Sequence, residues 1–302
     1  MDYRYFIAVA DSGSLAEASK ILHVATSAIS RQISLLEEAV GAQLFERRPR
    51  GMFLTSAGEV LARHAKRIRL EEEFVLSSIR SNDYPTAHTL RIVSTEGISR
   101  FFLPRIMAKY SMPAGQTKFV LNVTSPSNCI TLIANGDADI GLTFSTAPSK
   151  SVKIEFTHRS PICALVRRGH PLAEFKELAL AQLQPYPLAI TQQGTTQRQL
   201  FDLVCQMERL NFNEILLCNY SGAIQEFIKC SDAVSLGSAI SHSTSSIDHN
   251  ELISIKLTDQ QLAQRDIQII TMPNRILPDL VKSFISTMIE ELREPPPYNL
   301  TN

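Results

Sequence analysis

Apolar residues recur every three or four positions along the first eighty residues, a spacing that places them on one face of an α-helix. Phe6, Ile7 and Ala10 show this pattern first. They predict a helix over about residues 2–11, which Gly13 is expected to end. This segment should therefore bury one apolar face against its neighbours.

A second, short helix is predicted from the cap that precedes it. Glu17 follows Ser14 at the spacing of a capping box, in which the hydroxyl accepts from the third amide and the carboxylate returns to the cap amide. The helix then runs to about residue 22. Its inward residues are expected to be Leu15, Ala18 and Ile21.

A third helix is predicted to begin near Thr26, whose side chain offers a cap. Ile29, Ile33 and Leu36 recur at steps of four and three, so they are expected to face the core. The opposite face suits a helix in the major groove, because small side chains permit close approach and arginine binds phosphate or guanine. A solvated face without a DNA-binding role is the alternative. The residues of this face are Ser27, Ser30, Arg31 and Ser34.

An arginine-rich turn between two short extended pieces follows Gly41 and is interpreted as a wing. Residues 44–69 hold seven basic and two acidic residues, within a chain of 30 Lys+Arg and 30 Asp+Glu. Such a local excess favours binding to a phosphate backbone. Arg48 and Arg50 are therefore predicted to contact DNA, with Arg50 at the turn tip placed to enter a narrow minor groove. A solvated charge run is the alternative.

A long helix capped by Thr55 is predicted to reach about residue 80. Its apolar seam suits pairing with a second copy of the chain, as a two-fold symmetric DNA site requires. Packing against the same chain is the alternative. The seam consists of Leu61, Ala65, Ile68, Val75 and Ile79.

A polar break at residues 81–88 marks the best domain boundary. Beyond it, short apolar runs such as residues 90–93, 118–123, 140–144, 162–166 and 267–271 alternate with helix-like periods. Alternation of this kind predicts βα units around a mostly parallel sheet. The fold class is thus α/β with an N-terminal all-α winged helix-turn-helix.

Several classes of protein are disfavoured by what the sequence lacks. It has no Gly-x-Ser-x-Gly, Gly-x-x-x-x-Gly-Lys or His-Glu-x-x-His motif, and its seven histidines lack metal-ligand spacing, so no enzyme, cofactor or metal site is expected. Five cysteines without a Cys-x-x-Cys pair fit reduced thiols in a core. With no export signal and no membrane-length apolar run, a cytoplasmic location is expected.

The first sixty residues contain an ordered and dense series of short motifs. These are Phe6 to Ala10, Gly13 to Leu15, Ala18 and Ser19, Leu22 to Val24, Ser30 to Ile33, Leu36 and Glu37, Leu44 to Arg47, and Leu54, Thr55 and Gly58. In these motifs the chain resembles the LysR-type transcriptional regulators, and weaker likeness continues at residues 90–93, 103–104, 136–142 and 170–173. By position, the resemblance implies DNA contacts for Thr26, Ser27, Ser30, Arg31 and Arg50. A departure occurs at residues 25–27, Ala-Thr-Ser, where the family often has Ser-Gln-Pro.

The resemblance implies a winged helix-turn-helix at residues 1–58, a linker and dimerisation helix with a hinge at 59–88, and an effector domain at 89–293. That domain would hold two Rossmann-like α/β subdomains like those of a periplasmic binding protein, at about 89–160 with 267–293 and at about 161–266. The implied partners are double-stranded DNA with an interrupted palindrome, a small-molecule effector, RNA polymerase and further copies in a homodimer or homotetramer. A solute-binding protein or an α/β enzyme without a DNA-binding role is the alternative.

Polar residues just after the predicted strands are the effector-binding candidates, because open α/β sheets bind ligands beyond the carboxyl ends of their strands. Most are neutral, which favours a polar ligand, although each also suits a helix cap. Glu96 either complements the dipole of its own helix or contacts the ligand directly. Asn219, Tyr220 and Ser221 are candidates for the far wall. The main candidates are Ser94, Thr95, Glu96, Ser125, Asn128, Thr143, Phe144, Gln193, Thr195 and Thr196.

Overall fold

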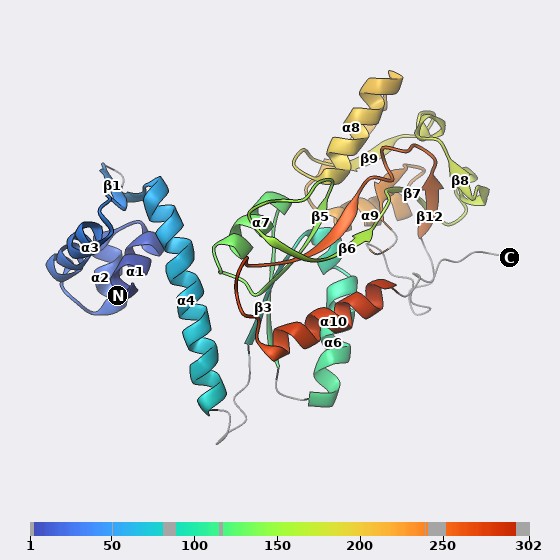
Figure 1. Cartoon of the computed structure of the whole chain (residues 1–302). Coiled ribbons are helices and arrows are strands. Elements are labelled where there is room, and N and C mark those ends of the chain that lie inside the picture. The colour runs from blue at the N-terminus through green and yellow to red at the C-terminus, as the bar shows by residue number, and fades with distance from the viewer. Residues whose placement is uncertain are drawn as a thin grey trace. The chain divides into compact units, whose positions relative to one another are not determined.

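The computed structural model describes residues 3–49, 51–80, 89–114, 117–238, 240 and 252–293. The chain divides into two compact units, residues 1–86 and 87–302. Figure 1 shows a small helical unit and a larger unit of helices and strands. Each unit is described by itself.

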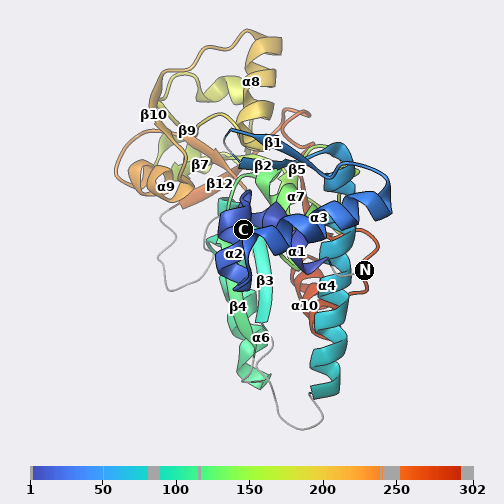
Figure 2. The same ribbon diagram turned by 90° about the vertical axis from the view of Figure 1, so that its left-hand side faces the viewer.

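In its described residues the N-terminal unit has three helices, a two-stranded hairpin and a long fourth helix, which can be followed in Figures 1 and 2. Its core joins Phe6 and Val9 of the first helix to Ile29, Ile33 and Leu36 of the third, and all five are buried as the apolar spacing predicts. The elements are α1 (Arg4–Ser12), α2 (Leu15–Leu22), α3 (Thr26–Val40), β1 (Phe45–Arg48), β2 (Gly51–Leu54) and α4 (Ser56–Arg80).

The predicted caps of this unit are confirmed in part. Ser14 Oγ accepts from the Glu17 amide at 3.4 Å, but the Glu17 carboxylate pairs with Lys20 at 2.7 Å instead of returning to the cap. Thr55 Oγ1 accepts from the Gly58 amide and caps α4. The cap expected from Thr26 is wrong, because Thr26 is already helical and the N-cap is Ala25, which has no side-chain acceptor.

The expectation that Ile21 faces inward is also wrong, since its side chain is 62% exposed. Leu15, Ala18 and Leu22 form the inward face of α2. At about 100° per residue, Ile21 lies about 90° from the centre of that face. The short helix therefore has room for only a narrow buried stripe.

The second unit contains two lobes, each built on its own sheet. Lobe I has a five-stranded sheet in the order β4-β3-β5-β13-β6. Helices α6 and α10 pack on one face of this sheet, and α7 packs on the other. Its elements are β3 (Thr89–Ser94), α5 (Glu96–Ser99), α6 (Phe102–Ala114), β4 (Lys118–Val123), α7 (Pro126–Ala134), β5 (Ile140–Ser145), β6 (Lys153–Arg159), β13 (Asp266–Thr271) and α10 (Asp279–Arg293).

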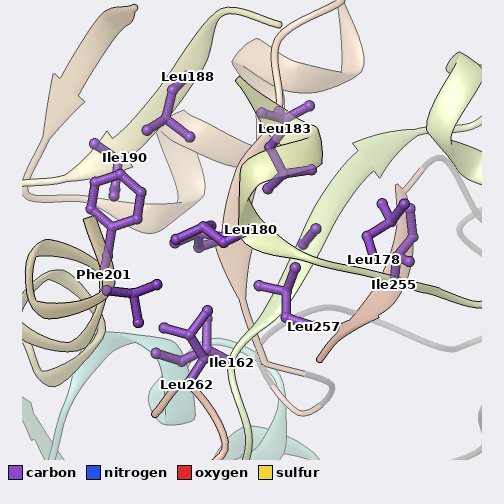
Figure 3. Packing of buried hydrophobic residues seen from close by; sticks show 14 of the residues in the cluster. Ile162, Leu178, Leu180, Leu183, Leu188, Ile190, Phe201, Ile255, Leu257 and Leu262 are labelled. Atoms are coloured by element: carbon purple, nitrogen blue, oxygen red, sulfur yellow. The ribbon is translucent and has the colours of Figure 1, made fainter. Parts of the chain in front are cut away.

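Lobe II has a four-stranded sheet in the order β11-β7-β12-β8 and a parallel pair, β9 with β10. Its larger core contains Phe201 of α8 together with Ile162, Ile190 and Leu257 (Figure 3). Helix α9 packs on the opposite side through Ile224 and Ile228. Its elements are β7 (Cys163–Arg167), β8 (Glu177–Leu178), β9 (Leu188–Thr191), α8 (Thr196–Glu208), β10 (Glu214–Cys218), α9 (Ser221–Lys229), β11 (Ser235–Gly237) and β12 (Leu252–Leu257), with 3-10 turns at Pro171–Glu174 and Leu180–Leu183.

The sheets are mixed, so the prediction of a mostly parallel sheet is wrong. Strand β13 runs antiparallel to both β5 and β6, and β7 runs antiparallel to β11 and β12. The parallel pairs are β3 with β4 and β5, β9 with β10, and β8 with β12. A buried apolar run has the same composition in either direction, so the sequence pattern contains no information about strand polarity.

In the described residues the chain passes between the lobes near residues 160 and 265, and these two passages are hydrogen-bonded to each other. The Ser160 amide donates to the Arg265 carbonyl at 2.8 Å, and the Ile162 amide donates to the Leu262 carbonyl at 2.9 Å. The Arg265 side chain is 2% exposed. Its Nε donates to the Ser160 carbonyl at 3.1 Å, and Nη2 donates to the Gly237 carbonyl at 3.3 Å. This arginine therefore ties both passages to lobe II.

Candidate functional site

The predicted DNA-reading face of α3 is open to solvent within its own unit. Thr26, Ser27, Arg31 and Ser34 are exposed and Ser30 is half-buried. The apolar residues of α3 occupy the other side of the helix. Arg31 has no hydrogen-bond or ion-pair partner among the described residues, so its guanidinium is available to a ligand. Arg50 lies outside the described residues.

Arg47 joins this face, although the sequence analysis did not select it. Its Nη2 donates to Ser30 Oγ at 3.3 Å. Side chains alternate across a strand, so in β1 Arg47 lies on the same side as the buried Phe45. That alternation is the signal by which Arg47 could have been found.

Arg48 is held within the wing. Its Nη2 lies 2.6 Å from Glu46 Oε2, and its guanidinium lies over the Phe53 ring at 5.0 Å. Another cation of the basic cluster, Lys66, is buried and pairs with Asp11 at 2.7 Å. The basic cluster therefore presents fewer free charges than a count along the sequence suggests.

The wing is fixed to α3 by Glu37. Its Oε1 accepts from the Leu44 amide at 2.8 Å and from the Phe45 amide at 3.2 Å. Between α3 and the wing lies a hollow of about 580 Å³ lined by Ile33, Glu37, Gln43, Phe45, Glu46, Arg47, Arg48 and Met52. Because Glu37 fixes the start of β1, the recognition face and the wing form one surface.

The predicted seam of α4 divides into two parts. Ala65 is buried and Leu61 packs against the helical core. This part of the seam therefore packs against its own chain, which was the alternative to pairing with a second copy. Ile68, Val75 and Ile79 are 37%, 53% and 65% exposed. The C-terminal part of the seam therefore remains uncovered within its own unit.

The effector candidates of lobe I differ in their surroundings. Ser94, Thr95, Thr143 and Phe144 are buried beyond or along β3 and β5. The Thr95 Oγ1 atom is buried and has no hydrogen-bond partner among the described residues. A buried hydroxyl without a partner costs free energy, so an unpaired one commonly marks a place for a ligand or water.

Three further candidates lie at helix starts: Ser125 and Thr195 cap the helices that follow them, and Asn128 lies in the first turn of α7. Ser125 Oγ accepts from the Asn128 amide at 3.3 Å and caps α7, while Asn128 Nδ2 donates to Thr124 Oγ1. Thr195 Oγ1 accepts from the Arg198 amide at 3.1 Å and caps α8. These residues hold their helices in place at the strand ends.

The other two candidates of lobe II lie near the start of α8. Gln193 is exposed, and its Nε2 donates to Asp202 Oδ2 at 3.4 Å. Thr196 is half-buried at the first position of the helix. Neither side chain is held toward lobe I by a hydrogen bond among the described residues.

Glu96 was expected either to complement the dipole of its own helix or to contact the ligand, but its carboxylate instead binds another helix. Its Oε2 accepts from the Ser221 amide at 2.8 Å, and its Oε1 accepts from the Gly222 amide at 3.3 Å. It therefore caps α9 of lobe II rather than its own helix. Arg100, one turn further, donates to Gln225 of α9 at 3.0 Å. These side chains bring the predicted far wall at Ser221 together with the end of β3.

Arg265 is a second residue that the sequence analysis missed. Its guanidinium lies over the Phe144 ring at 4.3 Å, and burial lowers its pKa to about 10. The one signal in the sequence that could have pointed to Arg265 is its position next to the segment that crosses from lobe II to lobe I.

The cysteines are free thiols with different surroundings. Cys129 and Cys163 are buried as expected, whereas Cys230 is exposed, so the expectation that all are core residues is wrong. Burial raises the pKa of Cys129 to about 12, which keeps it a thiol. Cys230 lies at the C-cap of α9 and faces solvent.

A winged helix-turn-helix with an open recognition face, followed by two α/β lobes, defines a DNA-binding regulator with a ligand-binding domain. Residues 1–59 match the family model of the bacterial regulatory helix-turn-helix protein, lysR family, and residues 85–293 match that of the LysR substrate binding domain. The chain therefore belongs to the LysR family of DNA-binding transcriptional regulators, as the sequence motifs predicted.

Curated and solved relatives agree with this assignment. A probable nitrogen assimilation transcriptional activator from Synechocystis is 26% identical over 297 residues, which is 95% of each chain. Full-length OxyR from Pseudomonas aeruginosa has a TM-score of 0.68 at 16% identity, covering 96% of this chain and 93% of that one. CbnR complexed with its target DNA has a TM-score of 0.56 at 19% identity, covering 97% and 99%. At these identities the two structures show the fold, and the curated relative is named as a probable transcriptional activator.

Among the described residues, no helix is both long enough and apolar enough to cross a membrane.

Proposed function

We propose that residues 1–58 bind duplex DNA through α3 and the β1–β2 wing, that residues 59–88 link and pair two copies, and that residues 89–293 respond to a small polar effector. The open hydroxyl face of α3 supports this most directly, because Arg31 is free on it and Arg47 lies beside Ser30. Thr26, Ser27, Ser30, Arg31 and Ser34 contact base edges and phosphates, with Arg50 at the wing tip. Arg48 orders the wing and contributes less charge.

Two copies are proposed to pair along the C-terminal part of α4. Ile68, Val75 and Ile79 follow heptad-like steps of seven and four and are exposed within their own unit. An apolar stripe of this kind is covered in stable proteins by a partner. Pairing places two recognition helices on an interrupted palindrome. We also propose that the dimers can associate into tetramers, that the protein contacts RNA polymerase and that it is located in the cytoplasm.

The effector is proposed to bind between lobe I, residues 89–160 with 267–293, and lobe II, residues 161–266. Thr95 and Thr143 are buried in lobe I. They are proposed to border the effector from lobe I, and the starts of α8 and α9 to border it from lobe II. Ser94, Glu96, Ser125, Asn128, Phe144, Gln193, Thr195 and Thr196 position these elements or contact the effector. Neutral hydroxyls and helix amides favour a ligand with several hydrogen-bonding groups.

The test is selection from a randomised duplex DNA library by the full chain, followed by footprinting of the enriched sequences. Two protected half-sites about one helical turn or more apart are expected. Retention should fall steeply between about 50 and 200 mM salt, because phosphate contacts release counterions. Selection without enrichment, or retention that does not change with salt, contradicts the proposal.

A further inference from the structure

One carboxylate connects the two lobes at the start of α9. Glu96 lies directly after β3 and Thr95, and its two oxygens accept from the amides of Ser221 and Gly222 at 2.8 and 3.3 Å. The residue at the N-cap of α9, Tyr220, makes no side-chain capping bond. A residue 125 positions earlier in the chain thus caps this helix across the lobe boundary.

The amides at the start of a helix of this length bind anions, because they carry free N–H groups and partial positive charge. Here the anion is supplied by the chain itself. Its surroundings contain more donors than Glu96 uses. Thr95 Oγ1 and Ser221 Oγ are both buried and have no hydrogen-bond partner in the described part of the chain.

A guanidinium also lies close to these amides. A Cβ atom added to Gly222 would lie 2.9 Å from Arg100 Nη1, so this guanidinium lies close to the backbone at Gly222. Arg100 donates to Gln225 Oε1 at 3.0 Å and lies 3.7 Å from the exposed Glu226. Two amides, the Ser221 hydroxyl and the Arg100 guanidinium therefore lie around the start of α9, where Glu96 is the bound carboxylate. The unpaired Thr95 hydroxyl belongs to the residue directly before Glu96.

We propose that Glu96 fills, as part of the chain, the position at the start of α9 where a carboxylate, phosphate or sulfate group of a ligand would otherwise bind, and so determines effector specificity. The inference rests on the proposed effector site between the lobes. A second anion placed there would lose the amide donors and be repelled by Glu96. The effector accordingly presents a neutral or cationic hydrogen-bond donor to this end of the site, such as a hydroxyl or an amine.

The test is a comparison of acetate and sulfate binding by the full-length wild type, Glu96→Ala and Glu96→Gln. Calorimetry measures affinity, and hydrogen exchange measures protection of the Ser221 and Gly222 amides. In wild type neither anion should bind saturably. Glu96→Ala vacates the position and should bind acetate at least tenfold more tightly, with slower exchange at these amides on saturation. Glu96→Gln keeps an acceptor oxygen there and should not gain acetate binding.

Controls separate this effect from general salt effects. Chloride at equal ionic strength should not reproduce the acetate effect. Glu177→Ala removes an exposed carboxylate that pairs with Lys256 and should gain no anion binding.

The proposal is overturned if folded Glu96→Ala binds acetate no better than wild type, or if wild type itself binds acetate at the α9 amides. Should Glu96→Ala fail to fold, Glu96→Gln remains informative, because loss of the charge should speed exchange at Ser221 and Gly222 severalfold. Unchanged exchange there overturns the proposal. DNA retention by the same samples tests the proposed regulator function separately, because the anion titration does not depend on DNA.

Discussion

Lys66 of α4 and Asp11 of α1 form an ion pair in which the lysine is almost completely buried. Lys66 Nζ lies 2.7 Å from Asp11 Oδ1, and the side chains are 9% and 44% exposed. The pair fixes the first half of the long helix to the first helix of the DNA-binding unit, beside the buried Ala62 and Ala65. The start of α4 is thus part of the DNA-binding core.

This pair predicts an asymmetric effect of mutation. Asp11→Ala leaves the buried ammonium without this carboxylate and should destabilise the chain by about 1–3 kcal/mol. Lys66→Met keeps the apolar stem and leaves the half-exposed Asp11 to water, so it should cost less than about 1 kcal/mol. Urea unfolding followed by circular dichroism measures both. Equal losses would contradict the argument from burial.

The arginines near α3 should contribute unequally to DNA binding. Arg31→Ala and Arg47→Ala should each weaken binding by about 1–3 kcal/mol, because both lie at the recognition face. Arg48→Ala should weaken it less, since Glu46 already neutralises Arg48. Fluorescence anisotropy with a selected duplex measures affinity. The thermal unfolding midpoint of Arg31→Ala should match wild type, and a large fall would show that Arg31 is structural.

Most of the helical unit could be predicted from local patterns. The spacing of Ile29, Ile33 and Leu36 located the buried face of α3 because a helix repeats every 3.6 residues. The cap at Ser14 depends on a residue only three positions away. Both features depend on residues that are close together in the sequence, so a short stretch of sequence is enough to predict them.

The proposed effector site between the lobes could be predicted only as a region. The amides that bind Glu96 lie 125 and 126 positions along the chain, and no local pattern pairs residues so far apart. Ser125 and Thr195 lie where expected but cap helices, because the same hydroxyl suits a cap or a ligand. The tertiary contact therefore decides the role of each polar side chain.

Gly58 is predicted to be essential for docking the wing on α4. A Cβ atom there would lie 2.1 Å from the Leu44 carbonyl oxygen, which is backbone and cannot move aside. Gly58→Ala should therefore destabilise the chain by about 1–3 kcal/mol, although alanine is otherwise the better helix residue. Urea unfolding measures the loss.

Gly41→Ala is the matched control for Gly58→Ala. Gly41 has a φ of +71° with no atom within 4 Å of an added Cβ, so its substitution introduces only backbone strain of about 1 kcal/mol. A smaller loss for Gly58→Ala than for Gly41→Ala would show that the α4 contact can relax.

His170 is predicted to make stability depend on pH. Burial lowers its pKa below the ordinary 6.5, and its Nδ1 accepts from the Leu172 amide at 3.1 Å. The unfolded chain therefore takes up a proton at a higher pH than the folded chain does. The stabilisation is complete above about pH 6.5 and is lost as the pH falls through the lowered folded pKa. Unfolding free energies measured from pH 7.5 to 5 should show this decline.

His170→Asn tests the assignment because asparagine keeps a capping acceptor without titrating in this range. It should flatten the pH profile. Burial also lowers the pKa of His158, opposed by Asp266, so His158→Asn should remove a separate part of the decline. An unchanged slope in His170→Asn would assign the dependence to other groups.

Thr95 is predicted to be dispensable for stability and required for the effector response. Its Oγ1 is buried without a partner among the described residues, so replacement by the isosteric valine removes an unsatisfied hydroxyl and should leave the unfolding midpoint unchanged or higher. A small-metabolite library screened by thermal shift identifies ligands that stabilise wild type. Thr95→Val should lose at least tenfold in affinity for them while it still binds the selected duplex, because α3 and the wing are untouched. If Thr95→Val responds to these ligands as wild type does, the effector lies elsewhere. A fall of several degrees in its midpoint would instead mean that Oγ1 is paired in the folded chain.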